Sequence, residues 1–284
     1  QSGDVDFYLD RGRVHGVAAS SLPAVVAQRW QTLTGEGLDV IVTTPVNEQA
    51  ATVAAEIQML RVIDGDVDLS VSVTGRDGNQ IGVGDEVITR CNEPGLVAMT
   101  DAQRAAVRRG KGSVCGRTVA NGDRWTVTGI GETGSVTLRD KRGASVTAPR
   151  SYVRSAVQLG YASTVHVAQG QTVDRSLAVV DAAVSSRESL YVQMTRGRSG
   201  NEVFVGLDGT ASAEQVVVDV AGRKDSGLSA HEFAEAEKAR VGQASTFIPA
   251  LRADFKRADQ QRFTDMIREA VTMWGPGDKE LLAQ

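Results

Sequence analysis

Two arginines that follow a short polar stretch are the side chains in this chain best suited to chemistry. Arg196 and Arg198 come directly after SSRESLYVQMT, which has helical character. A guanidinium group is planar, permanently charged and bidentate, so it can offset the charge that develops on a transferred phosphoryl group. The alternative for Arg196 is structural, because an arginine at a helix C-terminus satisfies carbonyl groups and the helix dipole. For Arg198, solvation or an ion pair with Glu202 is the alternative.

A second polar loop, HVAQGQTVD, lies between the apolar runs AVQLGYA and SLAVV. The hydroxyl of Thr164 and the imidazole of His166 can both bind phosphate oxygens without reading bases. Gly170 permits a backbone turn that other residues resist. A buried histidine in an ordinary turn is the alternative. Strand, loop, strand, helix and strand follow one another here, and we expect the loops to emerge at the carboxyl edge of a sheet.

These two stretches resemble the last conserved motifs of superfamily 1 DNA helicases. YASTVHVAQGQTVD is similar to motif V of the RecD-like branch, and SRESLYVQMTRGR is similar to motif VI with its Tyr-Val-x-x-Thr-Arg core. Within that branch the resemblance is greatest to the helicase half of conjugative relaxases of the TraA/TraI type. It covers residues 155–206 directly and extends more weakly over most of the chain. Val167 departs from the family, in which many relatives have a basic residue at this position.

The resemblance implies roles for individual residues. Arg196 would be the catalytic arginine that reaches an ATP site from the second of two RecA-like motor domains. The implied nucleotide contacts are Gln169, Gly170, Gln171 and Arg198. The implied contacts with single-stranded DNA are Thr44, Asn47, Thr164 and His166. For Thr44 and Asn47, a strand end and a helix cap are the alternative roles.

A local basic stretch adds a further candidate DNA contact. Residues 102–122 carry five basic side chains and no acid, in a chain whose formal net charge is −4. Clustered positive charge of this kind binds a phosphate backbone in a salt-dependent way. The candidates are Arg104, Arg108, Arg109 and Lys111, with Arg117 beside them. A solvated, poorly ordered loop is the alternative.

Length and composition exclude several other classes of protein. The chain has 284 residues, enough for two compact domains, and an ordinary content of 41% hydrophobic and 23% charged residues. Cys91 and Cys115 form neither a metal-binding pattern nor a disulfide framework, so we expect no metal site and a reducing, cytoplasmic location. No apolar run has the length of a membrane span, and the N-terminus lacks the layout of a signal peptide.

The sequence lacks the parts that would hold ATP on their own. It contains no G-x-x-x-x-G-K-[ST] phosphate loop, and the nearest match, Gly110-Lys111-Gly112-Ser113, lacks the upstream glycine and the adjacent hydroxyl. No apolar strand ends in an acidic pair for Mg²⁺. We therefore expect ATP and Mg²⁺ to be bound mainly by a first RecA-like domain of the same parent chain. This fragment alone is expected to carry no cofactor and to be inactive.

The pattern of the chain predicts an α/β fold. Alternating strand and helix signals, among them strands near 14–18 and 39–44 and helices over 20–34 and 47–61, favour a mostly parallel sheet. Residues 67–154 instead show short β-type runs and glycine turns, which indicate a small barrel. By resemblance this is an SH3-like barrel inserted in a RecA-like domain. Trp125 is either its core residue or a surface on which a base could stack.

These signals divide the chain into four parts. The predicted order is a first part of the RecA-like domain (1–66), the barrel (67–154), a second part with motifs V and VI (155–210) and a helical tail (211–284). By resemblance, the chain is the C-terminal motor domain of a single-stranded-DNA translocase or helicase that moves 5′ to 3′. It would come from a conjugative relaxase or an exonuclease V alpha-like protein. The alternative is a solitary RecA-like module that binds DNA or a protein and hydrolyses nothing.

Overall fold

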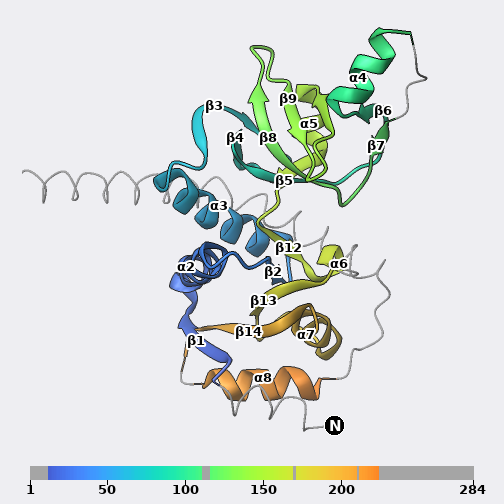
Figure 1. Cartoon of the computed structure of the whole chain (residues 1–284). Coiled ribbons are helices and arrows are strands. Elements are labelled where there is room, and N and C mark those ends of the chain that lie inside the picture. The colour runs from blue at the N-terminus through green and yellow to red at the C-terminus, as the bar shows by residue number, and fades with distance from the viewer. Residues whose placement is uncertain (1–11, 111–115, 169–170, 210, 224–284) are drawn as a thin grey trace, which may run out of the picture. The chain divides into compact units, whose positions relative to one another are not determined.

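The computed structural model describes residues 12–110, 116–168, 171–209 and 211–223 (Figure 1). The predicted helical tail beyond residue 223 lies outside the described residues. So do three candidate contact residues, Lys111, Gln169 and Gly170.

A five-stranded parallel sheet forms the first part of the fold, as the alternation of strands and helices predicts (Figure 1). Every pair of neighbouring strands in it is parallel. The strands in spatial order are β1 (Val14–Ala18), β14 (Gly197–Leu207), β13 (Val173–Val180), β2 (Val40–Thr44) and β12 (Ala162–Thr164). The predicted α/β fold class is thereby confirmed.

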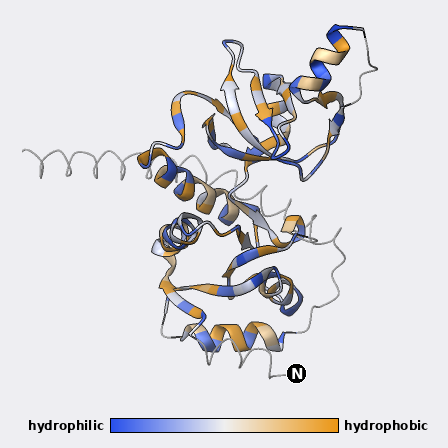
Figure 2. Cartoon of the chain, in the orientation of Figure 1, coloured by the Kyte–Doolittle hydropathy of each residue, from blue (hydrophilic) through white to orange (hydrophobic). Residues whose placement is uncertain are grey.

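Helices cover both faces of this sheet because successive strand residues point to opposite sides. Leu177, Val179 and Phe204 belong to the core under α2 (Leu22–Gly35) and α3 (Asn47–Ile63). Ala178, Val180 and Val203 belong to a second cluster with α7 (Arg187–Met194) and α8 (Ala213–Gly222). Figure 2 shows the hydrophobic stretch of α8 that takes part in this cluster. A short turn, η1 (Ala19–Ser21), links β1 to α2.

The helix starts differ in part from those predicted. Ser21 occupies the N-cap of α2, but its side chain makes no capping hydrogen bond. Asn47 is the first residue of α3 and not its cap; Val46 holds that position. For α7 the sequence offers Ser185 or Ser186 as the cap, with Glu188 in the first turn. Ser186 is the cap, and Ser189 rather than Glu188 completes its capping box.

Antiparallel strands between α3 and β12 make up the second part of the fold. A five-stranded sheet has the order β10 (Ser145–Ala148), β9 (Val136–Arg139), β8 (Arg124–Ile130), β5 (Glu86–Thr89) and β11 (Val157–Leu159). Two two-stranded antiparallel sheets accompany it, formed by β3 (Asp68–Thr74) with β4 (Gln80–Val83) and by β6 (Glu93–Ala98) with β7 (Arg117–Val119). We call the strands β3–β11, with α4 (Asp101–Arg108) and α5 (Arg150–Ala156), the insert.

The core of the insert contains Trp125, whose exposed fraction is 2%. Trp125 lies opposite Val87 in the β5–β8 pairing, so both side chains point into the core. The core interpretation of Trp125 is confirmed, and stacking on a base is wrong.

The chain returns to the parallel sheet through two short strands where the sequence pattern predicts one. The run AVQLGYA contains β11, which pairs with β5 of the insert, and the first residue of β12, which pairs with β2. Gly160 separates the two strands. A Cβ atom there would lie 3.1 Å from the carbonyl carbon of Val87, so a larger residue would disturb the close approach of the two segments. A single apolar run is divided because backbone pairing, which periodicity does not reveal, changes at Gly160.

Candidate nucleotide and DNA-contact sites

The parallel sheet separates the candidate residues into two groups at opposite edges. Thr44 and Thr164 are register partners at the carboxyl ends of β2 and β12. Gln171 and Arg196 instead precede β13 and β14, at the amino ends of those strands. The expectation that all these loops emerge at the carboxyl edge is therefore wrong for Gln171, Arg196 and Arg198. The reason is topological, because a connection between parallel strands must return to the amino edge before the next strand begins.

At the carboxyl edge, exposed and buried candidates alternate. Thr44 is fully buried, and its Oγ1 donates to the carbonyl of Val46 at 2.9 Å, which closes the turn into α3. Thr164 is also buried. Asn47 and His166 are exposed, the latter on α6 (Val165–Ala168). A phosphate that approaches this edge would therefore contact Asn47 and His166 first. The Thr44 hydroxyl is instead used within the turn that ends β2.

At the amino edge, protein acceptors surround the Arg196 guanidinium. Its Nε donates to the carbonyl of Val192 at 2.9 Å, and one Nη donates to Oγ1 of Thr195 at 3.0 Å. The other Nη lies 3.5 Å from the carbonyl oxygen of Gln171. Arg196 therefore hydrogen-bonds a carbonyl group in the last turn of α7, as the structural alternative predicts. The same contacts place Arg196 beside Gln171, at the described end of the HVAQGQTVD loop.

Backbone and side-chain hydrogen bonds order the described end of the HVAQGQTVD loop. The side-chain amide of Gln171 donates to the carbonyl of Val167 at 3.0 Å, and its backbone N–H donates to that of Ala168 at 3.1 Å. Arg198 is exposed, and its guanidinium donates to the carbonyl of Thr172 at 3.2 Å. Arg196 and Arg198 thus both contact carbonyl groups of this loop. Their catalytic and nucleotide-binding roles stay predictions.

Glu202 does not pair with Arg198. Its carboxylate accepts two hydrogen bonds from Arg29 of α2, at 2.6 and 2.8 Å, and lies 3.4 Å from Nε2 of His15. Burial alone would raise the pKa of Glu202, but the hydrogen bonds and charge of Arg29 outweigh it and hold that pKa below its usual range. The carboxylate thus fastens α2 to the sheet.

Sequence reasoning missed the buried Gln193, which joins α7 to the sheet. Its side-chain amide donates to the carbonyls of Thr43 at 3.3 Å and Val179 at 3.2 Å, so it reaches two strands. Ser176 returns a hydrogen bond to the Gln193 carbonyl at 3.0 Å. Helical spacing predicts that Leu190, Tyr191 and Met194 pack on the sheet. Leu190 and Met194 are buried, but Tyr191 is 64% exposed. The spacing of apolar residues does not detect a buried polar residue that lies among them.

The basic stretch of residues 102–122 is divided between structural and exposed arginines. Arg104 donates to Oγ of Ser145 at 2.8 Å and pairs with Asp101 at 3.3 Å, so it fastens α4 to β10. Arg108 and Arg109 are exposed. The described part of the stretch is not a poorly ordered loop, because α4 begins with a complete capping box at Thr100.

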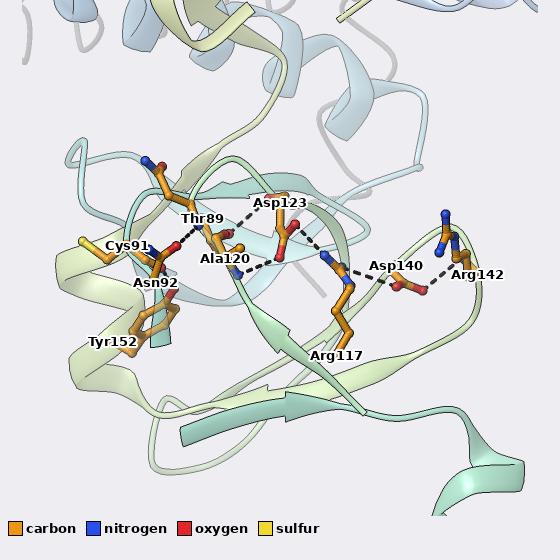
Figure 3. Close-up of polar contacts among 10 residues, drawn as sticks. Thr89, Cys91, Asn92, Arg117, Ala120, Asp123, Asp140, Arg142 and Tyr152 are labelled. Carbon is orange, nitrogen blue, oxygen red and sulfur yellow. Dashed lines mark hydrogen bonds and ion pairs between the residues drawn. The ribbon is translucent and has the colours of Figure 1, made fainter. Parts of the chain in front are cut away.

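Arg117 belongs to a polar network within the insert (Figure 3). Its guanidinium donates to Asp123 at 2.5 Å, lies 3.5 Å from Asp140 and stands over the Trp125 ring at 5.0 Å. Asp123 also accepts from the backbone N–H of Ala120 at 2.7 Å. With two carboxylates beside it, Arg117 carries little uncompensated charge toward DNA.

Comparisons with known proteins add little to these observations. No family model matches the chain. Uncharacterised proteins from two strains of Mycobacterium tuberculosis are each 35% identical to it over 107 residues, which is 37% of this chain and 59% of the relative. The chain therefore spans about three-fifths of the length of the curated relatives that it matches.

Among solved structures, similarity is found to Pif1 helicases. The Bacteroides enzyme in complex with ADP-AlF3 and single-stranded DNA is 16% identical with a TM-score of 0.37, over 70% of this chain and 45% of that one. The Candida albicans enzyme is 15% identical with a TM-score of 0.39, over 75% and 54%. A likeness this distant does not establish a function. Within the described residues, no helix is long and apolar enough to cross a membrane.

Proposed function

We propose that this chain is the second motor domain of an ATP-dependent translocase or helicase that acts on single-stranded DNA. The observation that carries the proposal is the division of the motif residues between two edges of one parallel sheet. Arg196 contacts the Gln171 carbonyl at the amino edge, while Asn47 and His166 are exposed near the carboxyl edge. A motor needs such separate places for nucleotide and DNA, joined by a rigid element that can transmit movement between them.

The finer features of the proposal rest on the motif resemblance. We propose a RecD-like superfamily 1 motor with 5′ to 3′ polarity, from a conjugative relaxase or an exonuclease V alpha-like protein. ATP and Mg²⁺ would be held mainly by a first RecA-like domain of the parent. Arg196 would then supply positive charge when the γ-phosphoryl group is transferred, which accords with the general requirements of phosphoryl transfer. The four predicted parts of the chain, with boundaries after residues 66, 154 and 210, belong to this proposal.

A titration of this chain with labelled single-stranded DNA, followed by fluorescence anisotropy, tests the DNA-binding part. The double variant Asn47→Ala/His166→Ala should weaken binding by at least about tenfold, because even one hydrogen bond to a charged group contributes about 1.5–3 kcal/mol. Gln28→Ala/Gln215→Ala provides the matched control, since both glutamines are exposed on other helices. Equal affinities for the two double variants would refute the assignment.

The alternative function, a module that binds DNA or a protein and hydrolyses nothing, gains support from one observation. The Arg196 guanidinium is already engaged by three protein acceptors. ATP hydrolysis by the full-length parent separates the two proposals. Turnover stimulated by single-stranded DNA favours the motor, and its absence from a folded, DNA-binding parent favours the module.

A further inference from the structure

Tyr161 lies immediately before β12 and contacts three separate elements. Its ring meets the Trp30 ring of α2 edge-on, with centroids 5.7 Å apart, and the Arg61 guanidinium of α3 lies 5.5 Å from its centroid. Its hydroxyl donates to Oδ1 of Asp85, between β4 and β5 of the insert, at 2.7 Å. With an exposed fraction of 3%, this one side chain joins both helices to the insert.

The Tyr161 hydroxyl has no hydrogen-bonding capacity left. Besides donating to Asp85, it accepts from Nη1 of Arg61 and from the backbone N–H of Glu86, each at 3.1 Å. A phenolic hydroxyl has one proton to donate and two lone pairs to accept with, and all are used here. Its position is therefore fixed by α3 and by the insert together.

Asp85 extends the same contact to a second residue of α3. Its Oδ2 accepts from the side-chain amide of Gln58 at 2.6 Å and from the backbone N–H of Gly82 at 2.7 Å. Gln58 also donates to the carbonyl of Gln80 at 2.8 Å. Burial raises the pKa of Asp85, which is fully enclosed. Each of these buried groups has a partner, and removing one partner would leave another group unsatisfied.

The strand that follows Tyr161 is short and lies at an edge of the sheet. β12 comprises three residues and pairs only with β2 among the strands of the parallel sheet, and its last residue, Thr164, leads directly into α6 and His166. Few backbone bonds hold so short a strand, so its position depends strongly on how the preceding residue, Tyr161, is anchored.

We propose that Tyr161 is a positioning residue that couples the insert to β12, so that a displacement of the insert moves Thr164 and His166. The coupling itself needs neither DNA nor ATP. Its consequence is that a force on the insert displaces the candidate DNA-contact residues, and this consequence rests on the proposed function.

Hydrogen–deuterium exchange on this chain tests the coupling with a matched pair of variants. Tyr161→Phe keeps the ring and removes the hydroxyl. Tyr152→Phe makes the same change within the insert alone, where the Tyr152 hydroxyl donates to the carbonyl of Cys91 at 2.7 Å (Figure 3). We expect amides 162–164 to exchange about tenfold faster in Tyr161→Phe, a factor that corresponds to about 1.4 kcal/mol, and at the wild-type rate in Tyr152→Phe. β13 and β14 should be unaffected in both.

Unchanged exchange at 162–164 in Tyr161→Phe would overturn the proposal, and so would an equal increase in β13, because that indicates general destabilisation. Gln58→Met provides a second variant, which removes the bond from α3 to Asp85 and leaves Tyr161 in place. A smaller increase at 162–164 supports the coupling, and no increase contradicts it. Because the comparison omits DNA, its failure is distinct from failure of the proposed function, which the anisotropy titration tests.

Discussion

At the scale of single residues, Arg196 has two possible roles that lead to different measurements. In the full-length parent, Arg196→Ala should lower ATP turnover by about 10³-fold or more and leave nucleotide binding largely intact, because a finger arginine acts mainly in the transition state. Arg196→Lys should restore little activity, since a point charge does not reproduce the planar fork. Single-turnover hydrolysis beside nucleotide titration measures both effects.

The contacts of Arg196 with Val192 and Gln171 require a control for stability. Arg198→Ala is suitable, because Arg198 holds the neighbouring Thr172 carbonyl in a similar way. Thermal melts should differ little between the two alanine variants. If Arg196→Ala hydrolyses ATP at a normal rate, or loses activity only by unfolding, Arg196 is a structural residue.

Glu202 gives a pH-dependent prediction at the same scale. Its pKa is lowered in the folded state, so its contribution to stability is present above the unfolded-state pKa and is lost as the pH falls through the folded-state pKa. Glu202→Gln should therefore lower the free energy of unfolding by about 1 kcal/mol at pH 7, a modest value because Arg29 is partly exposed to solvent.

Urea unfolding of the wild type and Glu202→Gln at pH 7 and at pH 3 measures this difference. The gap between the two proteins should shrink at pH 3. Glu56→Gln is the control, because that carboxylate is exposed on α3. A gap that is constant with pH would show that the charge of Glu202 does not contribute.

At the scale of elements, the sequence predicted the long elements that have a regular spacing of apolar residues. It missed the strands whose bounds depend on backbone pairing with distant strands. The stripe of α3, with Val53, Ala54 and Ile57 buried, and the buried run of β2 can be read from spacing alone. The division of one apolar run at Gly160 could not, because it depends on strands distant in sequence. The edge of the sheet that each candidate residue occupies, such as Thr164 or Arg196, followed from the topology and not from its position along the chain.

The basic helix α4 gives a prediction at this scale. Arg108→Ala/Arg109→Ala should weaken binding of single-stranded DNA and flatten the slope of log affinity against log salt by up to about 0.7 for each phosphate that these arginines neutralise. The double variant should melt like the wild type, because both side chains are exposed. Anisotropy titrations at several salt concentrations measure the slope.

Arg117→Ala is the contrasting variant for this experiment. Its guanidinium lies between Asp123 and Asp140, so its removal should lower the melting temperature and leave the salt slope nearly unchanged (Figure 3). If Arg108→Ala/Arg109→Ala leaves the slope unchanged as well, the exposed arginines of α4 are a solvated surface and not a DNA contact.

At the scale of the whole molecule, the two parts of the described fold share buried contacts. The ring of Tyr161 packs on the helices of the parallel sheet while its hydroxyl bonds to the insert, and Asn79 of the insert donates to the carbonyl of Ala51 in α3 at 3.1 Å. These contacts make the insert an integral part of the domain. In the motor proposed above, movement would then occur against the proposed first RecA-like domain.

The last prediction concerns what this chain does by itself. We expect no measurable ATP hydrolysis, with or without single-stranded DNA, because its sequence contains no phosphate loop and no acidic pair placed to hold Mg²⁺. An arginine that offsets charge in the transition state contributes nothing unless another domain first positions the phosphates. Phosphate release from highly purified protein should equal that of the Arg196→Ala variant prepared in the same way. DNA-stimulated turnover by the wild type that is lost in Arg196→Ala would contradict the prediction and show that this chain holds a complete site.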